Sequence, residues 1–305
     1  MAGGVVVRAA LALGLSCSVA WAGDIYGWGT GYAGVVPGIP GGSNFSRVSS
    51  WENFGLALRT DGTLTAWGTP ASTELSVPAG TFTDIAAGIG TGYAISTLGN
   101  IQAWGYDGYG ETSGVPGGTF TKVTAGRFHA TALRTDGTAI AWGYSSGTPT
   151  GTFTDVASGM DWSLGVRSDG SLYAWGAQNA YSQFSVPAGN NYTACAAGAF
   201  YGLALKSDGS LAAWGSSYGG VLGVPAGNNF VAIAAGYYDA IALRADGSIV
   251  AWGLNDFGQD NTPATGVYTS LAGGNRTIFA IGTVPAPGAA TLLAMGLMTA
   301  ARRRR

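Results

Sequence analysis

A short Trp-Gly motif recurs along most of the chain and constrains its fold more than any other feature. "AWG" or a close relative places Trp at 28, 67, 104, 142, 175, 214 and 252, with spacings of 33 to 39 residues. A second block precedes it, as in "TALRTDGTAIAWG" from 131, and a third precedes that, as in "TKVTAG" at 121. Self-similarity with this period is typical of solenoids and propellers, in which each unit buries its faces against its neighbours.

Each repeat is expected to form a small antiparallel sheet of three or four strands. An Asp-Gly pair between two apolar runs favours a hairpin, and we expect type I′ turns at Asp61-Gly62 and the equivalent pairs, with Gly99-Asn100 in the third unit. The small residues of the "AAG" block predict a strand where neighbouring sheets crowd together. The Trp side chain is expected to fill the wider space between sheets.

The two ends of the chain complement each other. There are seven "WG" strands and seven "AAG…AL" blocks when residues 47–58 and 270–281 are included, but the chain begins with "DIYGWG" alone and ends with a block that lacks its "AWG". We therefore predict an all-β, seven-bladed β-propeller over residues 23–283, closed by exchange of the N-terminal strand into the last sheet. An open β-solenoid is the alternative, but it would have no use for complementary half-repeats.

The first 22 residues are typical of a secretory signal peptide. One positive charge, Arg8, precedes an apolar stretch, and Ala20-Trp21-Ala22 supplies the small-x-small pattern before cleavage. A lipoprotein signal that uses Cys17 is the alternative. Without Arg8 and the four C-terminal arginines, 9 basic residues remain against 16 acidic residues, a net charge near −7. This balance argues against nucleic-acid binding, which requires a basic face.

Residues 284–305 form a distinct C-terminal segment. Pro285, Pro287 and Gly288 precede a 13-residue apolar run, and Arg302, Arg303, Arg304 and Arg305 close the chain. As a helix the run would measure about 20 Å, short of the roughly 30 Å hydrocarbon core of a bilayer. The segment is therefore expected to be a sorting signal that meets the membrane only transiently, with a plain anchor helix as the alternative.

The repeat blocks resemble a known family. "VTAGRFHATALRTDGTAIAWG", residues 123–143, is similar to the regulator of chromosome condensation repeat almost throughout, and the resemblance covers residues 24–282. The "VPAG" loops, as at Val77-Pro78, resemble those of secreted bacterial members such as the seven-bladed β-lactamase inhibitory protein. The eukaryotic founder exchanges nucleotide on a small GTPase and binds chromatin. A secreted acidic domain is badly placed for either activity, so neither is carried over.

The tail resembles the PEP-CTERM sorting signal of Gram-negative-type bacteria, with Ala286 where the family name expects Glu. The resemblance implies a membrane-embedded sorting protease that removes the tail. It also implies a mature protein that is secreted or held in the cell envelope or on the extracellular surface.

Residues able to carry chemistry are few. His129 is the only histidine, and we interpret it as a framework residue; Cys195 is expected to be a small buried hydrophobic residue. Asp107 with Glu111, and Asp256 with Asp260, could hold Ca²⁺, but neither pair has EF-hand spacing, so solvated loop acids are favoured. We therefore predict no catalytic residue, no metal and no cofactor.

A candidate binding site follows from the propeller symmetry. The residues just after each "AAG" fall in equivalent loops, here called the ring loops, which the symmetry gathers at one end. Aromatic and Arg side chains dominate interface hot spots, and aromatic rings also suit sugars. The candidate ligand-binding residues are Glu52, Arg127, Phe128, Asp161, Trp162, Phe200, Tyr201, Tyr237, Tyr238, Asp239 and Arg276. Their aromatic members are expected to form one contiguous, partly exposed patch; the alternative is that half of them pack between blades. By resemblance, the β-lactamase inhibitory protein uses the corresponding face.

Three hypotheses about function follow. The first is a non-enzymatic binding or scaffold protein of the cell surface or its exopolysaccharide matrix, with a protein or glycan ligand. The second is a proteinaceous inhibitor of a secreted or periplasmic enzyme, and the third is a lyase or hydrolase of unknown substrate. We expect a monomer that has the sorting protease as a further partner.

Overall fold

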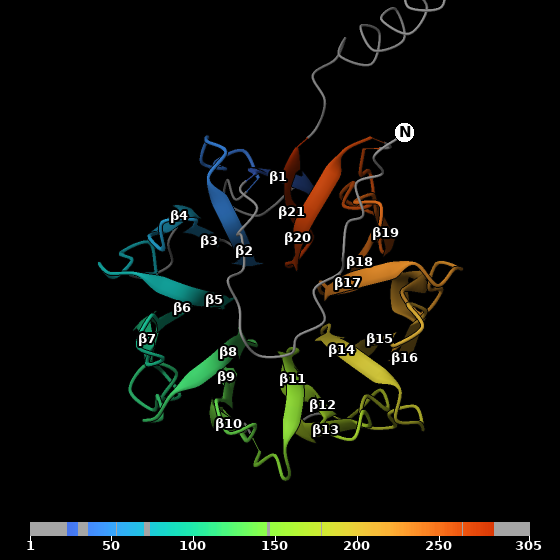
Figure 1. Cartoon of the computed structure of the whole chain (residues 1–305), viewed down its shortest axis with the longest axis horizontal. Helices are drawn as coiled ribbons and strands as arrows, with labels where there is room; N and C mark the ends of the chain where they lie inside the picture. The colour runs from blue at the N-terminus through green and yellow to red at the C-terminus, as the bar shows by residue number, and fades with distance from the viewer. Residues whose placement is uncertain are drawn as a thin grey trace, which may run out of the picture.

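The computed structural model describes residues 23–29, 36–52, 54–69, 74–144, 147–177, 179–263 and 265–283. They form seven three-stranded antiparallel sheets, arranged as blades around a central axis (Figure 1). The predicted all-β, seven-bladed propeller is therefore confirmed. The predicted signal peptide and sorting signal lie outside the described residues. No helix within the described segments is long and apolar enough to cross a membrane.

Each blade has an inner, a middle and an outer strand. The inner strands are β2 (Phe45–Trp51), β5 (Phe82–Gly88), β8 (Phe120–Ala125), β11 (Phe153–Ser158), β14 (Tyr192–Ala197), β17 (Phe230–Ala235) and β20 (Val267–Gly273). The middle strands are β3 (Phe54–Arg59), β6 (Thr91–Ser96), β9 (His129–Arg134), β12 (Trp162–Arg167), β15 (Tyr201–Lys206), β18 (Asp239–Arg244) and β21 (Thr277–Thr283). The outer strands are β4 (Leu64–Gly68), β7 (Ile101–Gly105), β10 (Ala139–Gly143), β13 (Leu172–Gly176), β16 (Leu211–Gly215), β19 (Ile249–Gly253) and β1 (Asp24–Gly29).

Blade seven joins the two ends of the chain. Its outer strand β1 pairs antiparallel with β21, so that Asp24 lies opposite Gly282 and Gly29 lies opposite Thr277. Strand β21 also pairs with β20, which completes the sheet in the order β1-β21-β20. The predicted closure by strand exchange is confirmed.

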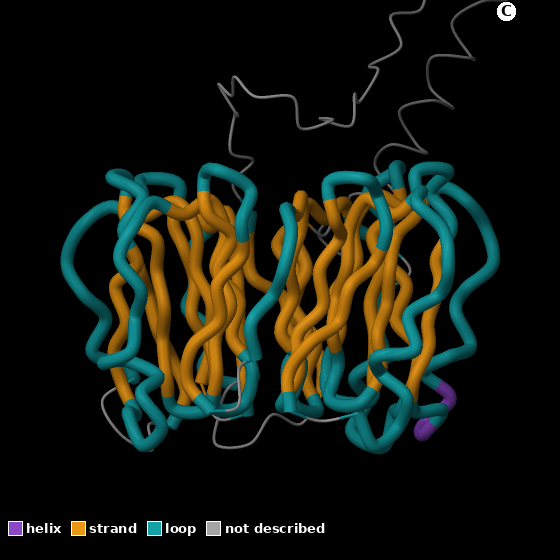
Figure 2. Tube along the Cα trace, turned by 90° about the horizontal axis from the view of Figure 1, so that it is seen from below, coloured by secondary structure: helices purple, strands orange, loops and turns teal. Residues whose placement is uncertain are grey.

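The strands run between two end faces, seen in side view in Figure 2. One end, the ring face, carries the ring loops and the ends of the outer strands. The short 3₁₀ helix η2 (Tyr218–Gly220), in the linker that follows β16, also lies at this end. The opposite end, the turn face, carries the Asp-Gly hairpins between middle and outer strands. Each linker that follows an outer strand therefore starts at the ring face and returns to the turn face.

The Trp of the repeat fills the space between blades, as predicted. Trp142 of blade three is buried in one cluster with Tyr93 and Ile95 of blade two, and its ring centroid lies 5.7 Å from that of Tyr93. Its indole N–H donates to the carbonyl oxygen of Glu111 at 2.9 Å, so a linker is held by the same side chain. Burial of a large aromatic side chain is worth roughly 1.5–3 kcal/mol, which makes the repeated Trp a main source of cohesion between blades.

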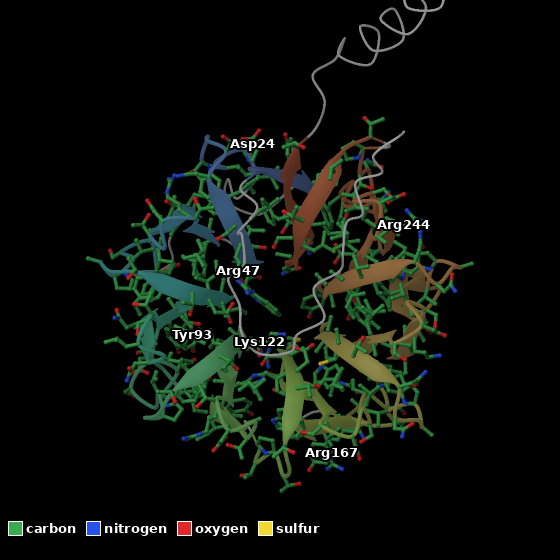
Figure 3. All side chains as sticks on the ribbon, in the orientation of Figure 1. Asp24, Arg47, Tyr93, Lys122, Arg167 and Arg244 are labelled. Atoms are coloured by element: carbon green, nitrogen blue, oxygen red, sulfur yellow. The ribbon has the colours of Figure 1, made fainter. Side chains whose placement is uncertain are left out.

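The inner strands crowd together around the axis, also as predicted. A Cβ atom on Gly159 would lie 2.4 Å from the carbonyl oxygen of Gly198 in the next blade. Ion pairs tie neighbouring inner strands where the side chains are longer: Arg47 to Asp84 at 3.1 Å, and Lys122 to Asp155 at 2.5 Å. Arg47 and Lys122 lie beside the central opening in Figure 3.

The hairpin turns differ from the predicted type I′. Gly62 has a positive φ of 85°, but Asp61 is not among the non-glycine residues of the described chain with positive φ. The Gly62 N–H donates to the Arg59 carbonyl oxygen at 3.0 Å, and the Arg59 N–H donates to the Thr63 carbonyl oxygen at 2.9 Å. This pattern is a three-residue loop, a type I turn followed by a left-handed glycine, in which only the last residue needs positive φ.

The third unit of the sequence repeat forms blade two, and its hairpin has the same turn, shifted by one residue from the predicted position. Gly99 has a φ of 87° and donates its N–H to the Ser96 carbonyl oxygen at 2.8 Å. Leu98 therefore replaces Asp in this unit, and Asn100 already belongs to the returning chain.

Candidate functional site

The ring loops lie at one end because each joins the inner strand of a blade to its middle strand. In most blades a glycine that follows the inner strand donates its N–H to the carbonyl oxygen of the residue three positions later, as Gly126 does to His129 at 2.8 Å. Only two residues lie between them, here Arg127 and Phe128. The third residue, His129, already begins the middle strand and is buried in the interface between blades.

This geometry divides the predicted ring residues by their position in the loop. Seven of them are partly exposed on the ring face: Glu52, Arg127, Phe128, Phe200, Tyr237, Tyr238 and Arg276. Four are buried: Asp161, Trp162, Tyr201 and Asp239. Asn53 of the first ring loop lies outside the described residues.

The predicted aromatic patch is wrong for Trp162 and Tyr201, which are both 0% exposed. Each is the first residue of a middle strand and therefore points toward the next blade. The Trp162 indole N–H donates to the Gly198 carbonyl oxygen at 3.1 Å, and the Tyr201 hydroxyl donates to the Asp239 carbonyl oxygen at 2.6 Å. These two side chains connect neighbouring blades and cannot touch a ligand on the surface.

Five tyrosines on the ring face were not predicted from the sequence. They lie in the linkers after the outer strands and are 41–58% exposed: Tyr106, Tyr109, Tyr144, Tyr181 and Tyr218. The available signal was an aromatic residue one to five positions beyond "WG", as in "WGYDGYG" and "WGSSYGG". The linkers differ in length, so this signal is weaker than the strand repeat.

The linker tyrosines join the exposed ring-loop residues in two aromatic clusters. The first aromatic cluster is centred on Phe128, whose ring centroid lies 6.2 Å from that of Tyr106 and 5.1 Å from that of Tyr109; Tyr144 lies 5.1 Å from Tyr109. The Arg127 guanidinium lies 5.1 Å from the centroid of Phe128.

The second aromatic cluster is centred on Phe200 and spans blades five and six. The Phe200 centroid lies 4.8 Å from Tyr181, 6.1 Å from Tyr237 and 6.0 Å from Tyr238. Tyr218 lies 4.6 Å from Tyr238. Burial raises the pKa of Tyr237 and that of Tyr238, so both hydroxyls stay protonated at neutral pH.

Polar side chains fix the linkers that carry these tyrosines. The Glu111 carboxylate accepts the Tyr109 N–H at 2.7 Å, and Asp107 accepts the Thr112 N–H at 2.8 Å. In another linker Gln183 accepts the Tyr181 N–H at 2.8 Å. Glu111 is 0% exposed, so the expected solvated loop acid is wrong for this residue. No cluster of three His, Cys, Asp or Glu residues suited to a metal occurs in the described part of the chain.

Main-chain hydrogen bonds connect ring loops of neighbouring blades. The Arg127 N–H donates to the Met160 carbonyl oxygen at 2.9 Å, the Ala199 N–H to that of Tyr237 at 3.2 Å, and the Tyr237 N–H to that of Gly274 at 3.1 Å. The Arg127 guanidinium forms a bidentate ion pair with Asp161, with contacts of 3.1 and 2.5 Å. These contacts hold the ring loops of blades three and four, and those of blades five, six and seven, at fixed spacing.

A cavity of about 500 Å³ opens on this face, lined by residues from blades one to four, six and seven and from the linkers that follow blades five and six. Its aromatic wall includes Trp51, Tyr218, Tyr237, Tyr238 and Phe257. Its polar residues include Glu52, Arg127, Asp239, Asp256, Asn275 and Arg276. The mixture of aromatic, acidic, amide and guanidinium groups is typical of a binding site.

The two residues best suited to nucleophilic or acid–base chemistry are buried and do not line this cavity. His129 is 3% exposed, its Nε2 lies 3.0 Å from the Ser163 hydroxyl oxygen, and burial lowers its pKa to about 4. Cys195 is buried as predicted, and burial raises the pKa of its thiol. Both therefore pack as framework groups.

Comparison with protein families identifies the repeat. The model of the Regulator of chromosome condensation (RCC1) repeat matches residues 120–146 and 230–259. These segments form parts of blades three and six, and both lie within residues 24–282, over which the sequence resembles this repeat. No curated protein matches the chain in sequence.

Solved structures share the whole fold. Prp20p from Saccharomyces cerevisiae has a TM-score of 0.75 at 17% identity, covering 92% of this chain and 96% of that one. The ectodomain of the receptor kinase CR4 from Physcomitrella patens has a TM-score of 0.68 at 21% identity, covering 76% and 68%. Human WBSCR16 has a TM-score of 0.70 at 16% identity, covering 86% and 99%. The chain is a seven-bladed β-propeller with two segments that match the RCC1 repeat model, and it is similar in fold to these proteins. Identities this low leave function to be argued from the site.

Proposed function

We propose that the protein is a non-enzymatic binding protein that recognises its ligand with the ring face. One observation carries the proposal: among the residues that the structure describes, all five tyrosines that are more than two-fifths exposed lie in linkers on this face, where they join ring-loop residues in the two aromatic clusters. Tyrosine offers a large amphipathic contact area with little side-chain entropy to lose, and it is enriched in interface hot spots. A relative in fold, Prp20p, has binding properties to Gsp1p and histones, so a propeller of this shape can act by binding proteins.

Inhibition of a secreted or periplasmic enzyme is the second candidate for the same surface. It is favoured by the rigid connection between ring loops, because a preorganised surface loses little entropy on docking. A lyase or hydrolase is less well supported, since His129 and Ser163 are both buried away from the cavity.

The cellular site is part of the proposal. The signal-peptide pattern in residues 1–22 and the sorting-signal pattern in residues 284–305 support a protein of the cell envelope or extracellular matrix of a Gram-negative-type bacterium, processed by a sorting protease. The intact mass of the protein recovered from its host decides this point. A mature chain that ends near residues 285–288 supports processing, and a retained arginine tail on the surface-exposed protein refutes it.

Binding through the ring face is tested with two matched variants. The triple variant Tyr109→Ser, Tyr181→Ser, Tyr218→Ser removes exposed rings from both clusters, whereas Leu98→Ser removes an 82% exposed side chain from the turn face. The immobilised protein is screened against secreted proteins and glycans of the host. Each tyrosine that touches the ligand contributes about 1–3 kcal/mol, so the triple variant should lose its ligand and the Leu98 variant should retain it. The reverse result would place the binding surface elsewhere.

A further inference from the structure

The cavity on the ring face contains a buried carboxyl group, one oxygen of which lacks a hydrogen-bond partner. Asp239 lines the cavity, is 1% exposed, and has no hydrogen-bond partner at Oδ2. It belongs to none of the ion pairs found in the described segments, which join Arg47 to Asp84, Lys122 to Asp155 and Arg127 to Asp161. Buried polar atoms are ordinarily hydrogen-bonded, so Oδ2 of this carboxyl group is an exception that a bound cation would remove.

The charges around Asp239 are also predominantly negative. Glu52 and Asp256 line the same cavity, and Asp260 is close enough to raise the pKa of Asp239 in addition to the effect of burial. The positive side chains of the cavity are Arg127, which is paired with Asp161, and Arg276, whose guanidinium lies over the Phe257 ring. Cavities lined by one sign of charge attract ligands of the opposite sign, and the mature propeller as a whole is acidic.

The aromatic walls of the cavity suit an organic cation, in which a charged group is joined to an apolar chain. Tyr218, Tyr238 and Phe257 stand around the cavity, and a cation over an aromatic face gains roughly 0.5–2 kcal/mol. The cavity already shows this contact within the chain, because the Arg276 guanidinium lies 4.5 Å from the centroid of Phe257. A hydrated metal ion would make no use of these rings, whereas the ammonium or guanidinium end of a long side chain would.

We propose that this cavity receives a basic side chain, a lysine or arginine, of a protein that docks on the ring face. The carboxylates of Glu52, Asp239 and Asp256 attract the charged end, and the tyrosines and Phe257 cover the methylene groups. This inference rests on the proposed function and specifies the chemistry of the partner.

The test uses small probes and isothermal titration of the purified full-length protein. The cationic probes are Nα-acetyl-lysine methylamide and Nα-acetyl-arginine methylamide, and the uncharged control is Nα-acetyl-norleucine methylamide. We expect both cationic probes to bind and the norleucine probe to bind at least tenfold more weakly. No binding of either cationic probe up to about 20 mM, or equal binding of the norleucine probe, would overturn the proposal.

Two variants assign the binding to this cavity. Asp239→Asn keeps the shape of the side chain and removes its charge, so we expect at least a tenfold loss of affinity for the lysine probe. Asp256→Asn changes an exposed residue at the cavity rim and should fold normally, with a loss of about threefold. Asp208→Asn on the turn face is the control and should change nothing. Unchanged affinity in both cavity variants contradicts the proposal.

The pH dependence gives a further readout. The titratable groups beside Asp239 are Asp260 from the linker of blade six and Tyr201 from β15, whose hydroxyl donates to the Asp239 carbonyl oxygen; Glu52, Asp256 and Arg276 lie on the cavity wall. Because burial and Asp260 raise the pKa of Asp239, binding of a cation displaces a proton. Affinity for the lysine probe should therefore be higher at pH 8 than at pH 5.

Other outcomes separate the inference from the proposed function. Binding of a neutral saccharide such as cellotetraose at this cavity, without binding of the lysine probe, would assign it to a glycan and overturn the inference alone. If the tyrosine triple variant keeps its natural ligand, the proposed function fails whatever the probes do.

Discussion

At the scale of single residues, position within the ring loop decides whether a side chain can bind anything. Phe128 and Phe200 are the second residues of their loops and are partly exposed, whereas Trp162 and Tyr201 are third residues and are fully buried. The third residue begins the middle strand, which lies between the inner and outer strands and is buried on both faces over its first five residues. Trp162 and Tyr201 were predicted to be exposed ligand-binding residues because they are aromatic and follow the "AAG" block, without regard to their position in the loop.

His129 should make the stability of the protein depend on pH. Burial lowers its folded-state pKa to about 4, whereas an unfolded histidine titrates near 6.5. Between these values the unfolded chain binds more protons, so the free energy of unfolding should fall as pH decreases from about 6.5 to about 4, by roughly 3 kcal/mol. Urea unfolding of the wild type and His129→Gln at pH 7 and pH 4.5 measures the effect.

The comparison isolates His129 because the opposing contributions of buried carboxyls, such as Asp84 and Asp239, are present in both proteins. The variant should show the smaller loss of stability at low pH, while binding at the ring face stays within about tenfold of the wild type. Equal pH dependence in the two proteins would show that His129 is not held neutral.

At the scale of strands and loops, the sequence predicts the repeated strands of the blades well and the linkers between blades poorly. The three strands of each blade follow from blocks that recur seven times, and the Trp and "AAG" positions were assigned correctly because one geometric reason applies in every blade. The linkers have different lengths and are fixed by individual side chains such as Glu111 and Gln183, so Tyr109 and Tyr181 had no shared position from which to be predicted. The turn type was missed because Asp-Gly suits two kinds of hairpin.

The glycine that follows an inner strand should be intolerant of a side chain. A Cβ atom on Gly159 would lie 2.3 Å from Trp162 Nε1 and 2.4 Å from the Gly198 carbonyl oxygen, so Gly159→Ala must separate two blades. We expect a loss of about 1–3 kcal/mol in urea unfolding, as for overpacked cores. Gly117→Ala is the matched control, because a Cβ atom there would meet nothing within 4 Å. A Gly159 variant as stable as the Gly117 variant would mean that the blades are less tightly packed than described.

At the scale of the whole molecule, closure depends on a single terminal strand. Strand β1 covers β21 along six paired positions and buries Ile25 against the first and last blades. Deletion of Asp24–Gly29 would expose the edge of β21, and exposed edges promote aggregation. We expect a lower melting temperature and self-association, measured by calorimetry and light scattering.

The control for this deletion is a chain that starts at Gly23 and keeps β1 complete. It should melt at a higher temperature than the deleted form and remain monomeric. If the deleted form matches it in both measurements, the propeller does not depend on the exchanged strand.

The pairing of β1 with β21 also sets an orientation. Asp24 and Gly282 are opposite each other at the turn face, so the described chain both enters and leaves the propeller at that end. A tether joined to the chain after Thr283 therefore holds the molecule by the turn face. The aromatic clusters and the acidic cavity then face away from the point of attachment, toward molecules that approach from solution.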